Sequence, residues 1–242
     1  MHRRRHYIYP DTNSLISAFC CECTTFLVES RELERPIHIA LSGGSTPISI
    51  FKQLAETTLL EDWKQVHIYW GDERCVEPDH EESNFRNAKT YLIDPLGIPE
   101  NQVHRIRGEE DPAVEAERYG VLLRDQLPVE YGSPVFDWVW LGVGEDGHTA
   151  SIFPDQIELW KAETTCVVAT HPESGQHRVS LSGGVINAAR RISFIVAGAR
   201  KSAVINDIVM KEGRYLDYPA FYVNPNSGNL EWYLDKDATD WL

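Results

Sequence analysis

Asp146 and His148 stand two residues apart in a segment that has glycine at positions 142, 144 and 147. A histidine near its ordinary pKa can take a proton as a general base, and a nearby carboxylate can orient its ring. A lone histidine is more often a structural residue. The carboxylate and the constrained glycine loop favour a functional role here, so the pair predicts proton-transfer chemistry at this loop.

A glycine turn earlier in the chain has the composition of a phosphate site. Gly43 and Gly44 are followed by Ser45, Thr46 and Pro47. Glycines let an anion approach the backbone, Ser45 or Thr46 can cap the following helix, and a helix N-terminus favours negative charge. An ordinary glycine turn with a helix cap would have the same sequence. The segment lacks the spacing of a P-loop or a dinucleotide site, so it implies neither ATP nor NAD.

Four further charged residues lie close to the predicted strands. Asp72 and Arg74 follow one strand, Arg178 opens another, and Lys201 follows a third. An arginine can bind phosphate or lactone oxygens with two parallel hydrogen bonds, and Asp72 could orient a substrate or handle a proton. Surface ion pairs and solvated charges explain the same residues, and spacing alone leaves both interpretations open.

The charge balance limits the classes of ligand. The chain of 242 residues has 23 Lys and Arg against 37 Asp and Glu, a net charge of −14. General binding to nucleic acid or to an anionic membrane needs a basic excess that this chain lacks. An anionic ligand must therefore be held by a few locally placed cations.

The apolar runs and the cysteines indicate in which cellular compartment the protein acts. Runs such as residues 136–143 are strand-length, far short of the roughly twenty residues that span a bilayer, and no apolar segment follows Arg5 as in a signal peptide. The five cysteines, three of them at positions 20, 21 and 23, lack the spacing of a disulfide framework or a zinc site. We expect a cytoplasmic protein with structural thiols and no metal.

Short β-rich runs alternate with helical patterns, and no linker divides the chain. The alternation predicts an α/β fold with one mostly parallel sheet, helices on both faces, and a single domain of residues 1–242. Ligands of such sheets bind beyond the carboxyl ends of the strands, where the reactive loops lie. The predicted strands are residues 37–41, 66–70, 136–141, 167–169, 178–181, 192–197 and 231–234, and the predicted helices are residues 46–56, 83–93, 112–126, 185–190 and 204–210.

In their order and spacing, the glycine turn at residues 43–46 and the segments around Asp72, His148, Arg178 and Lys201 resemble the 6-phosphogluconolactonase family, within the larger glucosamine-6-phosphate isomerase/deaminase group. The resemblance implies a single modified Rossmann-like domain that hydrolyses 6-phospho-D-glucono-1,5-lactone to 6-phosphogluconate, in the oxidative pentose phosphate pathway, without metal or cofactor. The implied partner is the small lactone, and we expect a monomer or a small homo-oligomer. The segments that carry the resemblance are LSGGSTP (41–47), WGDERCVEPDHEESNFRNAK (70–89), GVGEDGHTASIFP (142–154), RVSLSGGVINAAR (178–190), GARKSAV (198–204) and YPAFYVNPNSGNLEWYLD (218–235).

The resemblance also implies roles for single residues. The substrate phosphate would lie against residues 43–46, with Arg74 and Lys201 as cationic partners. His148 would activate the attacking water, and Asp146 would orient the histidine or a sugar hydroxyl.

Arg178 matches the family's arginine at the start of a strand near the pocket. The departures from the family pattern are small. Glu77 stands where the family often has proline, and the cysteines at positions 20–23 lie in a segment without a motif. Neither departure touches the expected chemistry.

Two other functions are alternatives. In the deaminase branch the loop continues His-Ile-Ala-Phe-Asn-Glu-Pro, and the glutamate serves ring opening and isomerisation, whereas Phe153 occupies that slot here. A regulator that binds a sugar phosphate on the same fold would usually add a DNA-binding module. The first 36 residues are too short for a helix-turn-helix domain and are not basic after Arg5. Both comparisons favour an enzyme that hydrolyses the lactone.

Overall fold

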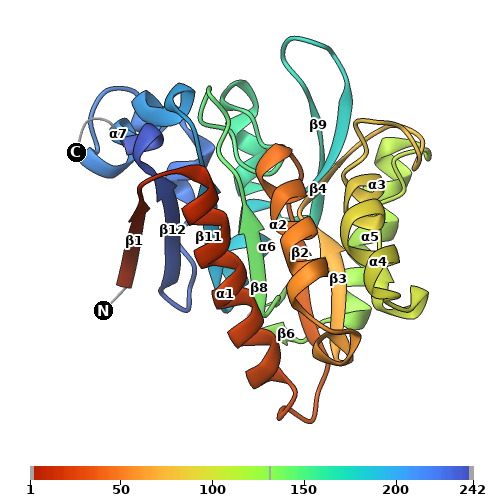
Figure 1. The fold of residues 1–242 in the computed structure, drawn as a ribbon. Helices are drawn as coiled ribbons and strands as arrows, with labels where there is room; N and C mark the ends of the chain where they lie inside the picture. Colours follow the sequence, from red (N-terminus) through yellow and green to blue (C-terminus); the bar gives the residue numbers. More distant parts are fainter. Residues whose placement is uncertain (1–2, 131, 240–242) are drawn as a thin grey trace.

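The computed structural model describes residues 3–130 and 132–239. At its centre is a seven-stranded sheet in which every neighbouring pair of strands runs parallel (Figure 1). From β2 the chain builds outward through β3 to β5 at one edge of the sheet. It then returns to β8 and builds outward through β11 to β12, which lies beside the edge strand β1, so the strand order reverses between β2 and β8. Such a reversal point is where ligands of open parallel sheets bind. The order across the sheet is β1 (Arg3–Tyr9), β12 (Asn229–Asp235), β11 (Ile192–Val196), β8 (Trp138–Leu141), β2 (Ile37–Leu41), β3 (Val66–Trp70) and β5 (Val103–His104).

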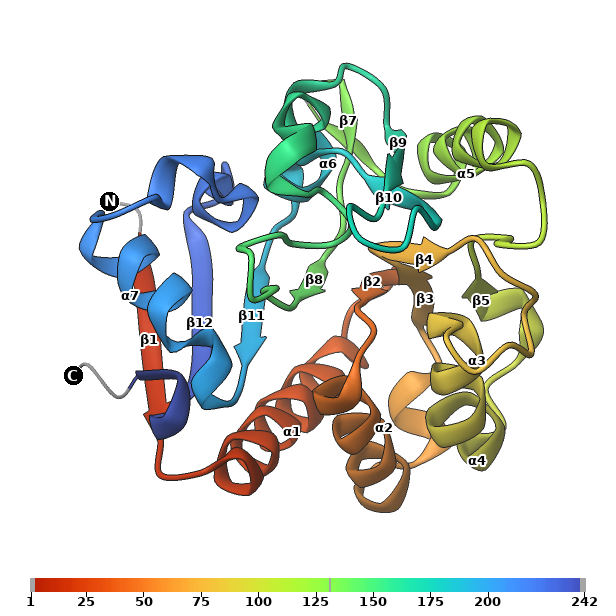
Figure 2. The same ribbon diagram turned by 90° about the horizontal axis from the view of Figure 1, so that it is seen from above.

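Helices cover both faces of this sheet (Figure 2). Helices α1 (Thr12–Ser30) and α2 (Ser45–Thr57) lie on one face, and α5 (Pro112–Gln126) and α6 (Gly183–Ala188) lie on the other. On β8, Trp138 and Trp140 point to the same face because they are two residues apart. The ring of Phe19 in α1 packs against both, with centroid distances of 5.5 and 5.0 Å. The predicted parallel α/β fold is therefore confirmed.

The hydrophobic core fills the space on both sides of the sheet. All five residues of β2 are buried, as expected for a strand between two helical layers. Large aromatic side chains dominate the core, and each one that is fully buried contributes about 1.5–3 kcal/mol through the hydrophobic effect. The largest fully buried side chains are Trp63, Trp70, Trp138, Trp140, Tyr69 and Tyr119.

A smaller antiparallel sheet begins just after the carboxyl end of β3. It contains, in order, β4 (Asp72–Arg74), β10 (His177–Leu181) and β9 (Cys166–Thr170). The expectation of a loop at residues 72–74 is wrong, and β9 and β10, which were expected in the main sheet, belong to this smaller one. β4 pairs with β10 across about a hundred residues of chain, and local sequence patterns do not reveal such long-range pairing.

The remaining helices are short, and a further pair of strands lies outside the two sheets. The predicted helix at residues 83–93 is present, but Lys89–Ile93 forms a π turn. Within the described residues, no helix is both long and apolar enough to cross a membrane. The other elements are α3 (Asn84–Ala88), α4 (Asp94–Leu96), α7 (Ser202–Met210), the pair β6 (Val129–Glu130) and β7 (Ser133–Pro134), and 3₁₀ segments Leu60–Trp63, Glu100–Gln102, Pro154–Lys161, Ala199–Lys201, Tyr215–Asp217, Pro219–Tyr222 and Lys236–Thr239.

Within residues 3–30 the chain forms β1 and α1, neither of which was predicted. Helix α1 starts after Asp11, whose carboxylate accepts the Ser14 N–H at 2.7 Å as an N-cap. Threonine, serine and cysteine are average or poor helix formers, and they weaken the helical pattern of this segment. Cys20 and Cys23 are buried, whereas Cys21 is exposed. Two of the three clustered thiols are thus structural, as expected.

Candidate active site

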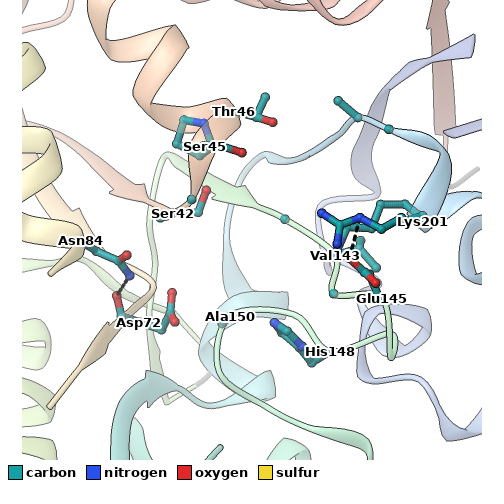
Figure 3. Close-up of a pocket in the computed structure, with 18 of the residues that line it drawn as sticks. Ser42, Ser45, Thr46, Asp72, Asn84, Val143, Glu145, His148, Ala150 and Lys201 are labelled. Carbon is teal, nitrogen blue, oxygen red and sulfur yellow. Dashed lines mark hydrogen bonds and ion pairs between the residues drawn. The ribbon is translucent and has the colours of Figure 1, made fainter. Parts of the chain in front are cut away.

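A cavity of about 450 Å³ lies at the carboxyl ends of β2, β3, β8 and β11, which are consecutive neighbours in the main sheet. Its wall comes from the segments that follow these strands and from β4 and β10 (Figure 3). Nine of the ten predicted site residues line it: Gly43, Gly44, Ser45, Thr46, Asp72, Arg74, His148, Arg178 and Lys201. The tenth, Asp146, is not part of the wall but binds His148.

The glycine turn leads straight into α2. Gly44 is the N-cap residue, with φ 110° and ψ 179°, a backbone conformation that residues with side chains rarely adopt. Among the described residues no side chain caps this helix, so the expectation that Ser45 or Thr46 does so is wrong, because both already belong to the first turn. N–H groups in a first turn have no partner within the helix. They remain donors for an anion in the cavity.

The imidazole of His148 is held by Asp146. Its Nδ1 lies 2.7 Å from Asp146 Oδ1, and the same oxygen accepts the His148 backbone N–H at 3.1 Å. Burial opposes ionisation of Asp146, but the hydrogen bonds and charge of His148 outweigh burial, so the pKa of this carboxyl lies below its ordinary value. An ionised Asp146 accepts the Nδ1 proton, which leaves Nε2 free to take a proton.

The loop of His148 is tied down at several points. A β-carbon at Gly144 would overlap both the imidazole and the Asp146 carboxylate, so only glycine fits there. Ser151 Oγ donates to Asp72 Oδ2 at 2.5 Å, which links this loop to the segment after β3. Ala150, in the cavity wall, has φ 49°, a left-handed conformation that costs a residue with a side chain about 1 kcal/mol or more. The fold thus holds the histidine loop in one defined conformation.

Arg74 and Arg178 are directly opposite each other on β4 and β10. Like charges on directly opposite residues of neighbouring strands repel each other. Burial and the nearby Arg74 lower the pKa of Arg178, which is only 9% exposed. The Nε atoms of both arginines are buried and have no hydrogen-bond partner in the described part of the chain. Two neighbouring guanidinium groups in one cavity wall indicate a site for an anion.

Lys201 and Glu145 lie across the cavity from Asp72 and Asn84 (Figure 3). Burial lowers the pKa of Lys201, and the charges of Glu145 and Asp146 oppose that effect. At the exposed rim, Arg200 Nε lies 3.2 Å from Glu145 Oε1. Cations therefore stand on more than one side of the cavity, and the convergence of Arg74 and Lys201 on one phosphate stays a prediction.

Comparison with known proteins identifies the family. A family model described as glucosamine-6-phosphate isomerases/6-phosphogluconolactonase matches residues 10–232, a range that contains all ten predicted site residues. A 6-phosphogluconolactonase from Haemophilus influenzae is 43% identical over 213 residues, which are 87% of this chain and 90% of that protein. The chain belongs to this family.

Solved structures agree with the family assignment. The crystal structure of a protein named devB is 42% identical, with a TM-score of 0.92 over 99% of this chain and 100% of the other. A 6-phosphogluconolactonase from Trypanosoma brucei is 29% identical, with a TM-score of 0.89 over 100% of both chains. The family fold therefore extends over nearly the whole chain.

Asn84 and Ser42 also line the cavity, although their residue types and spacing predict no role for them. Asn84 Nδ2 donates to the backbone carbonyl of Asp72 at 3.0 Å. Asn84 Oδ1 and Ser42 Oγ are buried and have no hydrogen-bond partner among the residues that the structure covers. The only available signal was their position inside or beside the segments that carry the family resemblance, since neither residue type is by itself typical of catalysis.

No metal site emerges from the described residues, where no three His, Cys, Asp or Glu side chains are arranged to hold a metal ion. His67 and His104 approach each other, with Nδ1 and Nε2 2.9 Å apart, but they hydrogen-bond each other instead of converging on a common point. The ionisable side chains in the cavity wall thus offer proton transfer and anion binding.

Proposed function

We propose that this chain hydrolyses 6-phosphogluconolactone to 6-phosphogluconate, in the oxidative branch of the pentose phosphate pathway. The observation that carries the proposal is the hydrogen-bonded pair of His148 and Asp146 at a cavity that also exposes Arg74, Arg178 and Lys201. A base together with several cations suits a substrate that has both a hydrolysable ester and a phosphate. The 43% identity to the Haemophilus influenzae lactonase supports the same activity.

In this reaction His148 Nε2 takes a proton from water while the water oxygen attacks the carbonyl carbon of the lactone. A new C–O bond forms, and negative charge develops on the carbonyl oxygen. The bond from this carbon to the ring oxygen then breaks, and the imidazolium returns its proton to that oxygen. Asp146 stabilises the imidazolium between the two transfers. The products are a carboxylic acid, which ionises, and a free hydroxyl.

The phosphate of the substrate binds the glycine turn at residues 43–46, with Arg74 and Lys201 as cationic partners. First-turn N–H groups of α2 and the hydroxyls of Ser45 and Thr46 supply neutral donors. Binding at the phosphate orients the lactone at a distance from the reacting carbon, so it contributes to the rate as well as to affinity. An arginine or a loop N–H group stabilises the charge on the carbonyl oxygen.

Asp72 has a positioning role in this proposal. One carboxylate oxygen accepts the Ser151 hydroxyl, and the side chain lines the cavity. In this proposal the other oxygen orients a sugar hydroxyl. Asp72 thereby connects the substrate to the loop that carries His148.

The residue at position 153, a phenylalanine, argues against the deaminase alternative. This residue occupies the slot of the deaminase glutamate, and its ring packs against the imidazole of His148 at a centroid distance of 4.8 Å. Phe153 is buried and cannot transfer protons. A regulator that only binds sugar phosphates would not need the oriented base, so the pair of His148 and Asp146 favours an enzyme.

We also propose one domain for residues 1–242 and action in the cytoplasm as a monomer or a small homo-oligomer. One continuous cluster of buried apolar side chains extends from Leu15 to Ala238, which supports a single domain. All five cysteines are free, which suits a reducing compartment.

Rapid measurement of proton release from freshly prepared 6-phosphogluconolactone tests the proposal. The lactone also hydrolyses spontaneously in buffer, so the uncatalysed rate is subtracted at each protein concentration. A rate proportional to protein concentration supports the proposed function. Ammonia release from glucosamine 6-phosphate without lactone hydrolysis would support the deaminase instead.

A further inference from the structure

Asp235, the last residue of β12, has a fully buried carboxylate that the proposed reaction does not use. In the described residues it has no basic partner, and neutral donors surround it. The Gly198 N–H lies 3.0 and 3.2 Å from its two oxygens, Thr12 Oγ1 lies 2.6 Å away, and the Ala238 N–H lies 2.9 Å away. A buried carboxylate is costly unless such hydrogen bonds stabilise its charge.

The most consequential of these donors is Gly198, because it opens the turn that carries Lys201. Gly198 follows β11 with φ 95°, and its carbonyl accepts the Lys201 N–H at 3.0 Å. Residues 197–201 all line the cavity. The carboxylate of Asp235 therefore holds the first residue of this turn, and the turn in turn holds the backbone of Lys201.

The other donors connect the same carboxylate to both terminal segments of the described chain. Thr12 is the first residue of α1, and Ala238 lies in the 3₁₀ segment Lys236–Thr239. Strands β1, β12 and β11 lie side by side at this edge of the sheet (Figure 2). Asp235 thus joins the start of α1 and the 3₁₀ segment Lys236–Thr239 to the turn in the cavity wall.

We propose that Asp235 is a positioning residue, which acts through Gly198 to hold Lys201 at the substrate. The inference rests on the proposed function of Lys201. A carboxylate suits this position because it only accepts hydrogen bonds, and all of its partners are donors. An asparagine of the same size removes the charge that strengthens these bonds and puts an NH₂ group where one of the two oxygens lies, so the Gly198 N–H keeps one acceptor instead of two and the turn loosens.

Asp235→Asn tests the inference in two backgrounds. In the otherwise unmutated protein we expect kcat/KM for 6-phosphogluconolactone to fall about ten- to a hundredfold, because small displacements of a binding group reduce rates strongly. In a Lys201→Ala background the same substitution should change kcat/KM within about twofold, since the residue through which Asp235 acts is gone. Hydrogen exchange of a peptide that covers residues 197–203 should become faster in Asp235→Asn.

Two threonines supply a milder variant and a matched control. Thr12→Val removes one donor to the carboxylate, so it should give a smaller loss of the same kind even if Asp235→Asn does not fold. The hydroxyl of Thr239 donates to the backbone carbonyl of Asp235 at 3.2 Å and does not touch the carboxylate. Thr239→Val should therefore leave both kcat/KM and the exchange of residues 197–203 unchanged.

Equal losses from Asp235→Asn in both backgrounds would overturn the inference, as would unchanged kinetics and exchange. If the unmutated protein does not hydrolyse the lactone, the proposed function fails, and exchange alone decides the positioning role. Faster exchange of the turn in both Asp235→Asn and Thr12→Val would then support it, and unchanged exchange would refute it.

Discussion

The side chain of Asn84 occupies the space that a β-carbon on Gly43 would need. A β-carbon built there would overlap Asn84 Oδ1, while Asn84 Nδ2 donates to the Asp72 carbonyl at 3.0 Å. Gly43 does not have a positive φ, so the turn requires its small size and not its conformational freedom. The contact fixes the glycine turn after β2 against the segment after β3, and both belong to the cavity wall.

Gly43→Ala should therefore lower kcat/KM by about a hundredfold, because the overlap must displace one side of the cavity. Asn84→Ala in the same chain removes the overlapping group and should recover much of the loss. Kinetics and melting temperature of both single variants and the double variant test this coupling. Gly184→Ala is the control, since the nearest described atom outside its own stretch of helix backbone would be Ser182 Oγ, 4.0 Å from the added β-carbon. A double variant no better than Gly43→Ala would show that the overlap is not the cause.

His148→Ala should lower kcat by about a hundredfold or more and leave KM within a fewfold, because a base that acts in the transition state contributes little to substrate binding. The measurement is the initial rate of proton release, corrected for spontaneous hydrolysis of the lactone. A corrected kcat close to that of the unmutated protein would remove His148 from its proposed role. Asp72 would then be the next candidate for the base.

Three histidines on the neighbouring strands β2, β3 and β5 should make stability fall in acid. His67 Nδ1 lies 2.9 Å from His104 Nε2, and His38 Nδ1 lies 3.2 Å from Tyr69 Oη. Burial lowers the pKa of His38 and of His104 from 6.5 to about 4, and it also lowers the pKa of His67. Between pH 6.5 and about pH 4 the unfolded chain binds more protons than the folded chain. The free energy of unfolding therefore decreases as the pH falls through this range.

Urea unfolding between pH 7 and pH 4 measures this effect. Carboxylates also titrate near the lower limit, so a variant must isolate the histidines. We expect His104→Gln to reduce the slope of unfolding free energy against pH, because one buried histidine no longer has to become charged. His177→Gln changes an exposed histidine and should keep the original slope. Equal slopes in the two variants would contradict the prediction.

Removal of divalent metals should leave the activity intact. A lactone already reacts with water, and a histidine base with cationic donors supplies the chemistry that the proposed reaction needs. Prolonged dialysis against a chelator, followed by the proton-release assay in chelated buffer, measures the dependence. Activity that vanished and returned only with an added divalent ion would overturn the mechanism.

The sequence predicted the elements whose pattern is local. Residues 37–41 and 66–70 read as buried strands because their apolar runs are continuous, and both are strands in the structure. The helix at Pro112–Gln126 has both predicted ends, and its start is set by Asp111, which caps it, and by the proline at its first position. In α1 the helical pattern is weak, and β1 is an edge strand with three arginines, so neither was predicted.

Which residues come together in the site could also be predicted from local features of the sequence. Loops after neighbouring parallel strands meet at one edge of the sheet, so residues that follow different strands come together without any knowledge of their contacts. The contacts themselves were not predictable. Asn84 reaches Gly43, and Asp235 reaches Gly198 and Thr12, only because the folded chain brings distant segments together. No local composition or spacing distinguishes these two residues from ordinary polar side chains.

Unphosphorylated gluconolactone should be a poor substrate. If residues of the glycine turn, Arg74 and Lys201 hold the phosphate, loss of this group removes several charge-assisted hydrogen bonds, each contributing about 1.5–3 kcal/mol. Allowing for two such bonds and imperfect additivity, kcat/KM should fall at least about a thousandfold. Comparable turnover of both lactones by the unmutated protein would remove the phosphate site from the proposal.

Lys201→Ala decides which part of the substrate this cation serves, because Lys201 and the arginine pair come from different segments of the cavity wall. If Lys201 binds the phosphate, the substitution should weaken hydrolysis of the phosphorylated lactone much more than hydrolysis of the unphosphorylated one, which narrows the preference between them. The measurement is kcat/KM for both lactones in the variant and in the unmutated protein. Equal losses on both substrates would assign Lys201 to the sugar, the carbonyl oxygen or the fold, and would leave Arg74 and Arg178 as the cations for the phosphate.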